Sequence, residues 1–185
     1  MRRLAGREIA GPGLTHIRAI LVAVLLCLPA AGSAETVEVG NQINAFSIAD
    51  QFGKPLAVDG SVRAILFVRD RVSAEVMKRA LADQGSAQLA GAGAVYVSDM
   101  SGVPELIRKY VAIPMLRKRG YAIGVDQSGS YTRDFPSHEK QPTLLVLDGL
   151  RITRIEQLAS IETVRTALAQ LKAPETAAPA APAEN

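Results

Sequence analysis

Apolar residues along the chain gather in short runs that polar, glycine-containing turns separate. The runs in "RAILFVRD" (63–70) and "GAVYVSD" (93–99) are compact and bounded by charged or small residues, which is typical of buried strands. "NAFSIADQFGKPLAV" (44–58) alternates around a glycine turn and predicts two short strands in a hairpin. "QPTLLVLDGLRITRI" (141–155) predicts a second hairpin, turned by its Asp-Gly pair.

Helical periodicity lies in the segments between these strands. "SAEVMKRALADQG" (73–85) predicts a helix that Ser73 caps and Gly85 ends. "SIETVRTALAQL" (160–171) predicts a closing helix. "GVPELIRKYV" (102–111) predicts a helix with a proline in its first turn. Its apolar residues are expected to face the core, namely Leu106, Ile107, Tyr110 and Val111.

The remaining segment, "YAIGVDQSGSYTRDF" (121–135), predicts a strand, a turn and a short helix. The order of elements is therefore a hairpin, three strands alternating with helices, a second hairpin and a helix. Alternating strands and helices favour an α/β sandwich with a central sheet of parallel strands, flanked by helices. The second hairpin adds antiparallel strands, which makes the predicted sheet mixed.

The two ends of the chain have a different composition. Four arginines precede an apolar run at 19–31, and small residues follow it, which is the layout of a signal peptide covering residues 1–34. The run is shorter than the roughly 20 residues that span a bilayer, although an uncleaved membrane anchor is the alternative. Residues 173–185 are rich in Ala and Pro and predict a disordered tail. The folded domain is expected at residues 35–172.

Cleavage before Glu35 would change the charge and the chemistry of the chain. The remaining residues carry 17 basic and 17 acidic side chains, so the basic character of the whole chain gives no argument for nucleic-acid binding. The only cysteine, Cys27, would leave with the signal peptide. An exported domain without cysteine has neither a disulfide nor thiol chemistry.

The segments 46–58, 64–77, 125–135 and 141–152, in this order and spacing, resemble the thioredoxin-like superfamily, and most closely its peroxiredoxin and TlpA-like branch. The resemblance implies a thioredoxin-like α/β/α sandwich with an N-terminal β-hairpin. It also places Val72-Ser73-Ala74-Glu75 about where a thioredoxin carries its two cysteines, and Pro142 at the position of the family's cis-proline. A thiolate is the nucleophile in the redox reactions of the family, and this chain has none there.

The predicted binding site consists of the residues around the positions at which a thioredoxin carries its cysteines and its cis-proline. Two guanidinium groups in "RDR" (69–71), beside a helix N-terminus, are suited to hold a carboxylate or phosphate, and a solvated turn with an internal ion pair is the alternative. Family members bind extended peptide by strand-like pairing beside the cis-proline, which needs no thiol. The candidate residues are Arg69, Asp70, Arg71, Ser73, Glu75, Gln141, Pro142 and Thr143.

Two functions from different classes follow from this site. The first is a redox-inactive, periplasmic accessory module that binds an envelope protein or an extended peptide, with no cofactor, no metal and no nucleic acid. The alternative is a non-thiol enzyme or small-ligand carrier that uses Asp70, Glu75 and His138 in the same cleft. A hydrolase built on Ser73 and His138 is disfavoured because a triad also needs an orienting acid and an oxyanion hole. Contact with a membrane is expected only if the leading segment stays uncleaved.

A second basic cluster, Arg117 to Arg119, follows the predicted helix at 102–111. Its three cations are suited to anionic lipid headgroups or to an acidic partner. A solvated loop is the simpler interpretation, because three charges are few.

Overall fold

A computed structural model describes residues 36–172, so the predicted signal peptide and tail lie outside the described residues. The elements in chain order are β1 (Phe46–Ala49), β2 (Pro55–Val58), β3 (Ala64–Val68), α2 (Arg71–Ala80), α3 (Gly85–Ala92), β4 (Ala94–Asp99), α4 (Glu105–Ile107), the π-helical turn η1 (Arg108–Ala112), α5 (Ile113–Leu116), β5 (Gly124–Asp126), β6 (Thr143–Asp148), β7 (Arg151–Gln157) and α6 (Ile161–Lys172).

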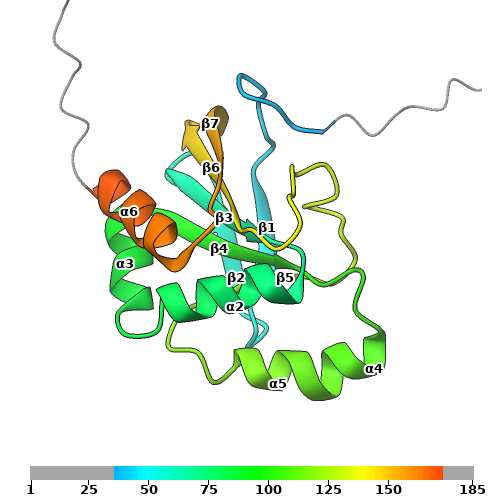
Figure 1. Ribbon diagram of the computed structural model, residues 1–185. Helices are drawn as coiled ribbons and strands as arrows, with labels where there is room; N and C mark the ends of the chain where they lie inside the picture. The colour runs from blue at the N-terminus through cyan, green and yellow to red at the C-terminus, as the bar shows by residue number, and fades with distance from the viewer. Residues whose placement is uncertain (1–35, 173–185) are drawn as a thin grey trace, which may run out of the picture. The chain divides into compact units, whose positions relative to one another are not determined.

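Five strands form one mixed sheet in the order β5-β4-β3-β6-β7, and β1 and β2 form a separate antiparallel hairpin (Figure 1). Strands β3, β4 and β5 are parallel, whereas β6 runs antiparallel to β3 and β7 antiparallel to β6. Every residue of β3 is buried because this strand is central and covered on both faces. The predicted α/β class, mixed sheet and N-terminal hairpin are confirmed.

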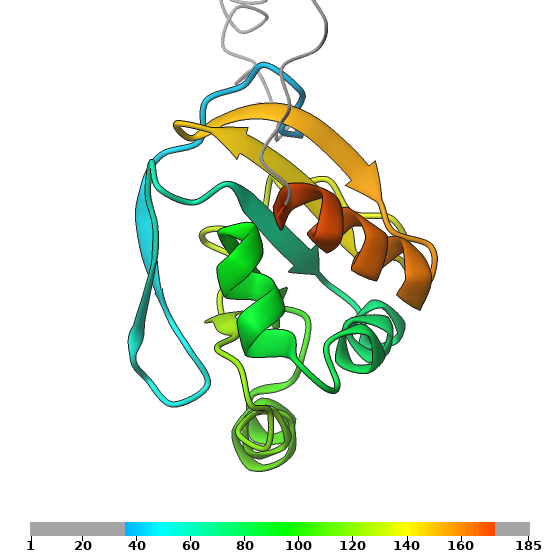
Figure 2. The same ribbon diagram turned by 90° about the vertical axis from the view of Figure 1, so that its left-hand side faces the viewer.

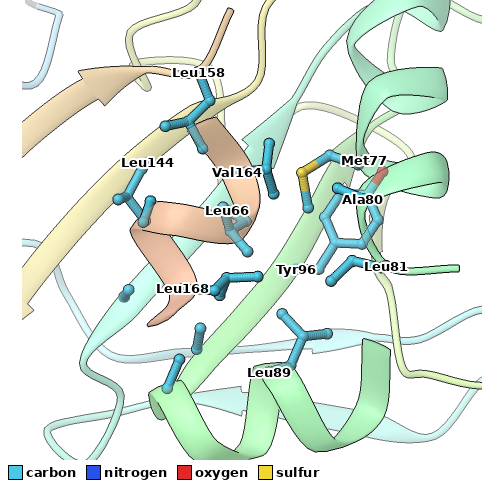
Figure 3. Close-up of a cluster of buried hydrophobic side chains, with 14 of the residues drawn as sticks. Leu66, Met77, Ala80, Leu81, Leu89, Tyr96, Leu144, Leu158, Val164 and Leu168 are labelled. Carbon is cyan, nitrogen blue, oxygen red and sulfur yellow. The ribbon is translucent and has the colours of Figure 1, made fainter. Parts of the chain in front are cut away.

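Three helices cover one face of the sheet (Figure 2). Leu66 and Leu144 point from the sheet toward Met77 of α2 and Leu168 of α6, and Leu89 reaches the same cluster from α3 (Figure 3). Met77, Leu66 and Leu144 have no exposed surface. Burial of such side chains contributes about 1.5–3 kcal/mol each, which makes this cluster the main stabilising core.

The opposite face of the sheet is covered by the β1–β2 hairpin and by irregular segments, which enclose a second cluster that contains Ile48, Phe67 and Phe135. Gly124 of β5 allows the hairpin to approach, because a Cβ there would lie 2.7 Å from Cγ2 of Ile48. Buried Gln51 fixes the hairpin turn: its Nε2 donates to the carbonyl oxygen of Tyr121 at 2.8 Å, and its Oε1 accepts from the Ile123 amide at 2.8 Å.

Two predicted helices differ from the structure. The helix predicted at 73–85 is two helices, α2 and α3, and Gly85 begins the second instead of ending the first. Gly85 is required there, since a Cβ would lie 2.5 Å from Cδ1 of Tyr121. The short helix predicted before Phe135 is a series of turns, because a buried carboxylate organises this loop, as described below.

The expectation that the helix at 102–111 faces the core is wrong. The helix continues as α4, η1 and α5 through Leu116, and none of its residues is buried. Leu106, Ile107, Tyr110 and Val111 are all exposed. Figures 1 and 2 place this helix at the end of the domain opposite the first described residues. Within residues 36–172, no helix has the length and apolar character to cross a membrane.

Candidate functional site

The carboxyl ends of the three parallel strands meet at one edge of the sheet, where open α/β sheets usually bind their ligands. Arg69 follows β3, Asp99 ends β4 and Asp126 ends β5. Two of these groups pair: Nε of Arg69 donates to Oδ2 of Asp99 at 2.9 Å. The Asp99 side chain is almost fully buried, whereas that of Arg69 is 36% exposed.

The ionised form of Asp99 is stabilised by its neighbours. Burial raises the pKa of this carboxyl, but hydrogen bonds from Ser101 and from the Arg69 guanidinium outweigh burial and hold the pKa below its usual value. The amide of Ser101 donates to Oδ1 at 2.8 Å. Asp99 is therefore a fixed anion that holds Arg69 in place.

The rest of the Arg69 guanidinium is engaged by the loop before β6. Its Nη2 donates to the carbonyl oxygens of Thr132 at 2.6 Å and Arg133 at 3.2 Å, and its Nη1 donates to Oγ of Ser137 at 3.1 Å. The guanidinium carbon also lies 5.1 Å from the centre of the Phe67 ring. Arg69 thus joins β3, β4 and this loop, which leaves little of its hydrogen-bonding capacity for a ligand.

Asp126 organises the same loop from β5. Its Oδ1 accepts from the amides of Ser128 at 3.3 Å and Gly129 at 2.9 Å. Its Oδ2 accepts from the amide of Tyr131 at 2.9 Å and from both the amide and the hydroxyl of Thr132 at 3.0 Å. Five donors surround this buried carboxylate, so it is a structural centre and not a free general base.

Asp70 joins the start of α2 to the segment before β6. It is the N-cap residue of α2, and its Oδ1 accepts from the amides of Val72 at 2.8 Å and Ser73 at 2.9 Å. Its Oδ2 accepts from the Lys140 amide at 3.1 Å. Burial raises the pKa of Asp70, but these backbone bonds and the Ser73 side chain outweigh burial and lower it.

Ser73 is not the N-cap, which corrects the sequence prediction. It occupies the third helical position of a capping box, where its hydroxyl donates to the Asp70 carbonyl oxygen at 2.9 Å. Ser73 is fully buried, and within the described residues no hydrogen bond links it to exposed His138. Glu75 pairs with Lys78 at 2.7 Å and Arg79 at 3.1 Å, and both cations lower the pKa of its carboxyl.

Gln141, Pro142 and Thr143 lie beside this junction, as the sequence predicts. Thr143 pairs with Phe67 across β3 and β6, and its hydroxyl donates to Oε1 of Gln157 at 2.9 Å. The Gln141 amide donates to the His138 carbonyl oxygen at 3.3 Å. No peptide bond of residues 36–172 is cis, so the expected cis form at Pro142 is wrong. The bend before β6 is made instead at Lys140, whose φ is +65°.

The surface that remains available is small and well defined. We name it the junction edge: Arg71 and Val72 at the start of α2, and residues 138–141 before β6. Arg71 and residues 138–140 are exposed, Gln141 is half-buried, and Val72 is 49% exposed although it is apolar. The junction edge combines one apolar side chain, that of Val72, with the four ionisable side chains of Arg71, His138, Glu139 and Lys140.

Two shallow hollows, of about 210 and 200 Å³, lie away from the junction edge, and none of the predicted site residues lines either of them. Among residues 36–172, no three His, Cys, Asp or Glu side chains are grouped so that they could hold a metal ion.

The sequence analysis did not predict three residues that support the carboxyl edge of the sheet, namely Asp99, Asp126 and Ser137. Asp99 and Ser137 bind Arg69 from positions 30 and 68 residues away. Asp126 organises a loop that the sequence pattern assigned to a short helix. The only available signal was position, because Asp99 and Asp126 each end a predicted strand of a parallel sheet.

Comparisons with known proteins agree with this architecture. No family model matches the sequence, and no curated protein matches it. Among solved structures, peroxidoxin BcpB from Mycobacterium tuberculosis matches with a TM-score of 0.50 and 19% identity over 74% of this chain and 97% of that one. A putative protein disulfide isomerase from Bacteroides thetaiotaomicron matches with a TM-score of 0.52 and 16% identity over 73% and 88% of the two chains.

A putative thiol:disulfide interchange protein DsbE from Chlorobium tepidum matches with a TM-score of 0.50 and 15% identity over 74% of this chain and 96% of that one. This chain has a thioredoxin-like fold. The mixed sheet flanked by helices agrees with these matches. This thioredoxin-like domain differs in one chemical respect from the thiol proteins that these names describe: residues 36–172 contain no cysteine.

Proposed function

We propose that the protein is an exported, redox-inactive thioredoxin-fold module that binds another envelope protein or an extended peptide at the junction edge. The observation that carries this proposal is the arrangement of side chains at the start of α2, where the thiol proteins of this fold carry their reactive cysteine. Ser73, close to the expected position of a reactive cysteine, is buried in a capping box, while its neighbours Arg71 and Val72 are exposed. In this proposal the exposed neighbours of buried Ser73 bind the partner by non-covalent contacts.

The internal contacts of the neighbouring residues support a binding role over a catalytic one. Arg69 and Asp70 each bridge two segments, and Thr143 is buried against Gln157. In this proposal they hold the junction edge in shape, and Arg71, Val72 and Gln141 meet the partner. A general base needs an accessible group beside a substrate site, whereas here both carboxylate oxygens of Asp70 accept from backbone amides.

Export is supported by the leading segment of the chain, in which arginines precede an apolar run and small residues follow.

Site-directed photocrosslinking tests the proposal. A photoreactive phenylalanine analogue replaces Val72 in the protein expressed in its native envelope, and the same analogue replaces Lys54, an exposed residue of the β1–β2 turn, as the matched control. We expect a discrete adduct from position 72 and none from position 54, insensitive to thiol-blocking reagents and weakened by Arg71→Glu. Mass spectrometry then identifies the partner.

Equal adducts from both positions, or an adduct that disappears on thiol blocking, would contradict the proposal. A purified protein that reduces insulin disulfides would also contradict it. If position 72 gives no adduct and a metabolite raises the melting temperature, the small-ligand function is correct instead, because binding to the native state stabilises it.

A further inference from the structure

The helix formed by α4, η1 and α5 presents an apolar face that the domain does not cover. Leu106 and Tyr110 form one row spaced four residues apart, and Ile107, Val111 and Met115 form the neighbouring row. The exposed fractions of these side chains are 71%, 67%, 51%, 51% and 53% in that order. Five adjacent apolar side chains with half or more of their surface in water mark an interaction surface and not scattered exposure.

Contacts at both ends fix the orientation of this helix. Near its start, Nη1 of Arg108 donates to the carbonyl oxygens of Val103 at 3.0 Å and Met100 at 3.3 Å. Just after its end, Nε of Arg117 donates to the carbonyl oxygen of Gln51 at 2.9 Å. The apolar rows therefore point away from the domain because the helix is held by its other side.

The positive charge of the domain is concentrated in this helix and the turn after it. Residues 36–172 carry 17 basic and 14 acidic side chains. Segment 105–119 holds five of the basic ones and a single acidic one, so the remainder of the domain has twelve basic and thirteen acidic side chains and is slightly negative. The segment is thus both apolar and cationic, on a domain that is otherwise close to neutral.

A basic hollow lies where this helix ends. It measures about 210 Å³ and is lined by four cationic side chains together with Gly120, Tyr121 and Ala82. Lys118 and Arg119 come from the turn after α5. Lys78 and Arg79 come from the end of α2 and are both paired with Glu75, so Lys118 and Arg119 are the cations that we expect to contact a lipid phosphate. A lipid phosphate is an anion of suitable size and charge for such a hollow.

We propose that residues 105–119 bind the protein peripherally to an anionic lipid bilayer. An interfacial helix buries an apolar face at the boundary of headgroups and acyl chains, while cations beside it contact anionic headgroups. Tyr110, whose ring lies 5.4 Å from Nζ of Lys109, has the amphipathic character that places tyrosines at membrane interfaces. The scarcity of acidic residues disfavours a basic or mixed-charge protein partner on this surface.

This membrane surface is separate from the junction edge and does not depend on it. The two proposals can therefore fail independently, since photocrosslinking at Val72 and lipid binding by the helix use different residues.

Co-sedimentation with lipid vesicles tests the proposal. The protein, with the N-terminus it carries in the cell, is mixed with vesicles of phosphatidylcholine containing about one third phosphatidylglycerol, or of phosphatidylcholine alone. We expect binding to the anionic vesicles, with a loss of about tenfold in partitioning for Leu106→Ser/Tyr110→Ser. Val39→Ser, which alters an equally exposed apolar residue of the first described segment, leaves partitioning unchanged.

A second pair of variants tests the electrostatic contribution to lipid binding. Lys118→Glu/Arg119→Glu lowers partitioning by at least about thirtyfold, because it removes two cations that face the anionic surface and adds two negative charges. Arg133→Glu/Arg154→Glu makes the same change in net charge on other exposed residues and has less than half that effect. Raising the salt concentration to about 0.5 M weakens binding of the wild type, because exposed charges are then screened.

A spectroscopic reporter locates the contact. The chain contains no tryptophan, so Tyr110→Trp introduces a single one on the apolar face and Val39→Trp a single one on the first described segment. We expect the emission of Trp at position 110 to shift to the blue and to be quenched by brominated lipid, and that of position 39 to remain unchanged.

Three results would overturn the proposal. Unchanged fluorescence at position 110 in the presence of anionic vesicles would remove the membrane contact. A dimer in analytical ultracentrifugation that Leu106→Ser/Tyr110→Ser abolishes, without lipid binding, would assign the apolar face to a second copy of the chain. Saturable binding of inorganic phosphate that Lys118→Glu/Arg119→Glu abolishes, again without lipid binding, would assign the basic hollow to a free anion.

Discussion

Arg69 and Asp99 pair at 2.9 Å across the carboxyl ends of two parallel strands, 30 residues apart in the sequence. The Asp99 carboxylate is buried, and the Arg69 guanidinium donates to three other oxygens around it. The predicted binding arginine is thus a structural residue, and its replacement has consequences for stability before any for binding.

Arg69→Met is expected to destabilise the fold by about 2 kcal/mol. Methionine keeps an apolar stem against Phe67 but removes four hydrogen bonds and leaves the buried Asp99 carboxylate without its cation. Urea unfolding measures the loss. Arg71→Met, in the exposed neighbouring position, serves as the control and stays within about 0.5 kcal/mol of wild type. Equal effects of the two variants would show that the Arg69 contacts do not stabilise the fold.

The lowered pKa values of Asp99 and Asp70 predict a loss of stability in acid. Their folded pKa values lie below the ordinary value of 3.8, so the ionised carboxylates stabilise the fold above that pH. The stabilisation is lost as pH falls through the folded pKa values. Urea unfolding from about pH 7 down to about pH 2.5 measures the decline.

Asp70→Asn isolates the part of that decline due to the helix cap. Asparagine caps a helix as well as aspartate but does not titrate. The variant is therefore expected to be less stable than wild type at neutral pH, with a difference that narrows in acid. A constant difference at every pH would show that ionisation of Asp70 has no part in the effect.

Gly124→Ala is expected to cost about 1–3 kcal/mol, because the added methyl group would meet Cγ2 of Ile48 at 2.7 Å and Cδ2 of Leu56 at 3.3 Å. Both contacts lie where the β1–β2 hairpin packs on the sheet. Gly102→Ala is the control, since a Cβ at Gly102 meets nothing within 4 Å. Thermal unfolding of the two variants compares them, and a stable Gly124→Ala protein would mean that the hairpin packs less closely.

Asp126→Asn is expected to loosen the loop after β5. The amide nitrogen that replaces one carboxylate oxygen cannot accept from Gly129, Tyr131 or Thr132, so at least one buried donor loses its partner, at a cost of about 1–3 kcal/mol. Hydrogen exchange checks this locally: the amides of Ser128 and Gly129, or those of Tyr131 and Thr132, exchange faster, depending on which oxygen position the amide nitrogen takes. The amides of the central strand β3 change only in proportion to the global loss. Unchanged exchange at both Gly129 and Thr132 would contradict the assigned role.

The central strands were predictable because they are compact apolar runs that end in polar turns. The predicted runs at 63–70 and 93–99 correspond to β3 and β4, and the second predicted hairpin corresponds to β6 and β7. The orientation of the helix after β4 was not predictable from periodicity. An apolar stripe shows that a helix is amphipathic, but it does not show whether the stripe packs on the core of its own domain or contacts another molecule or a membrane.

The proximity of the two candidate segments was predictable, whereas their binding role stays a prediction. The sequence resemblance places segments 69–75 and 141–143 side by side, and the structure has them joined through Asp70 and Lys140. The roles within the site depend on contacts between distant residues, such as Arg69 with Asp99 and with the Thr132 carbonyl oxygen. The local sequence pattern carries no information on such pairs. In the sequence alone, an arginine that binds other residues of the domain therefore cannot be distinguished from one that binds a ligand.

The two oxygens of Asp70 have a further consequence for recognition. One oxygen holds the first turn of α2 and the other holds the backbone at Lys140, so the two sides of the junction edge form a single preorganised unit. A partner that binds this edge finds the backbone already ordered and bears little of the conformational entropy cost that mobile loops impose on association. Loss of that carboxylate would therefore slow productive encounter and shorten residence even if every contacting side chain remained in place.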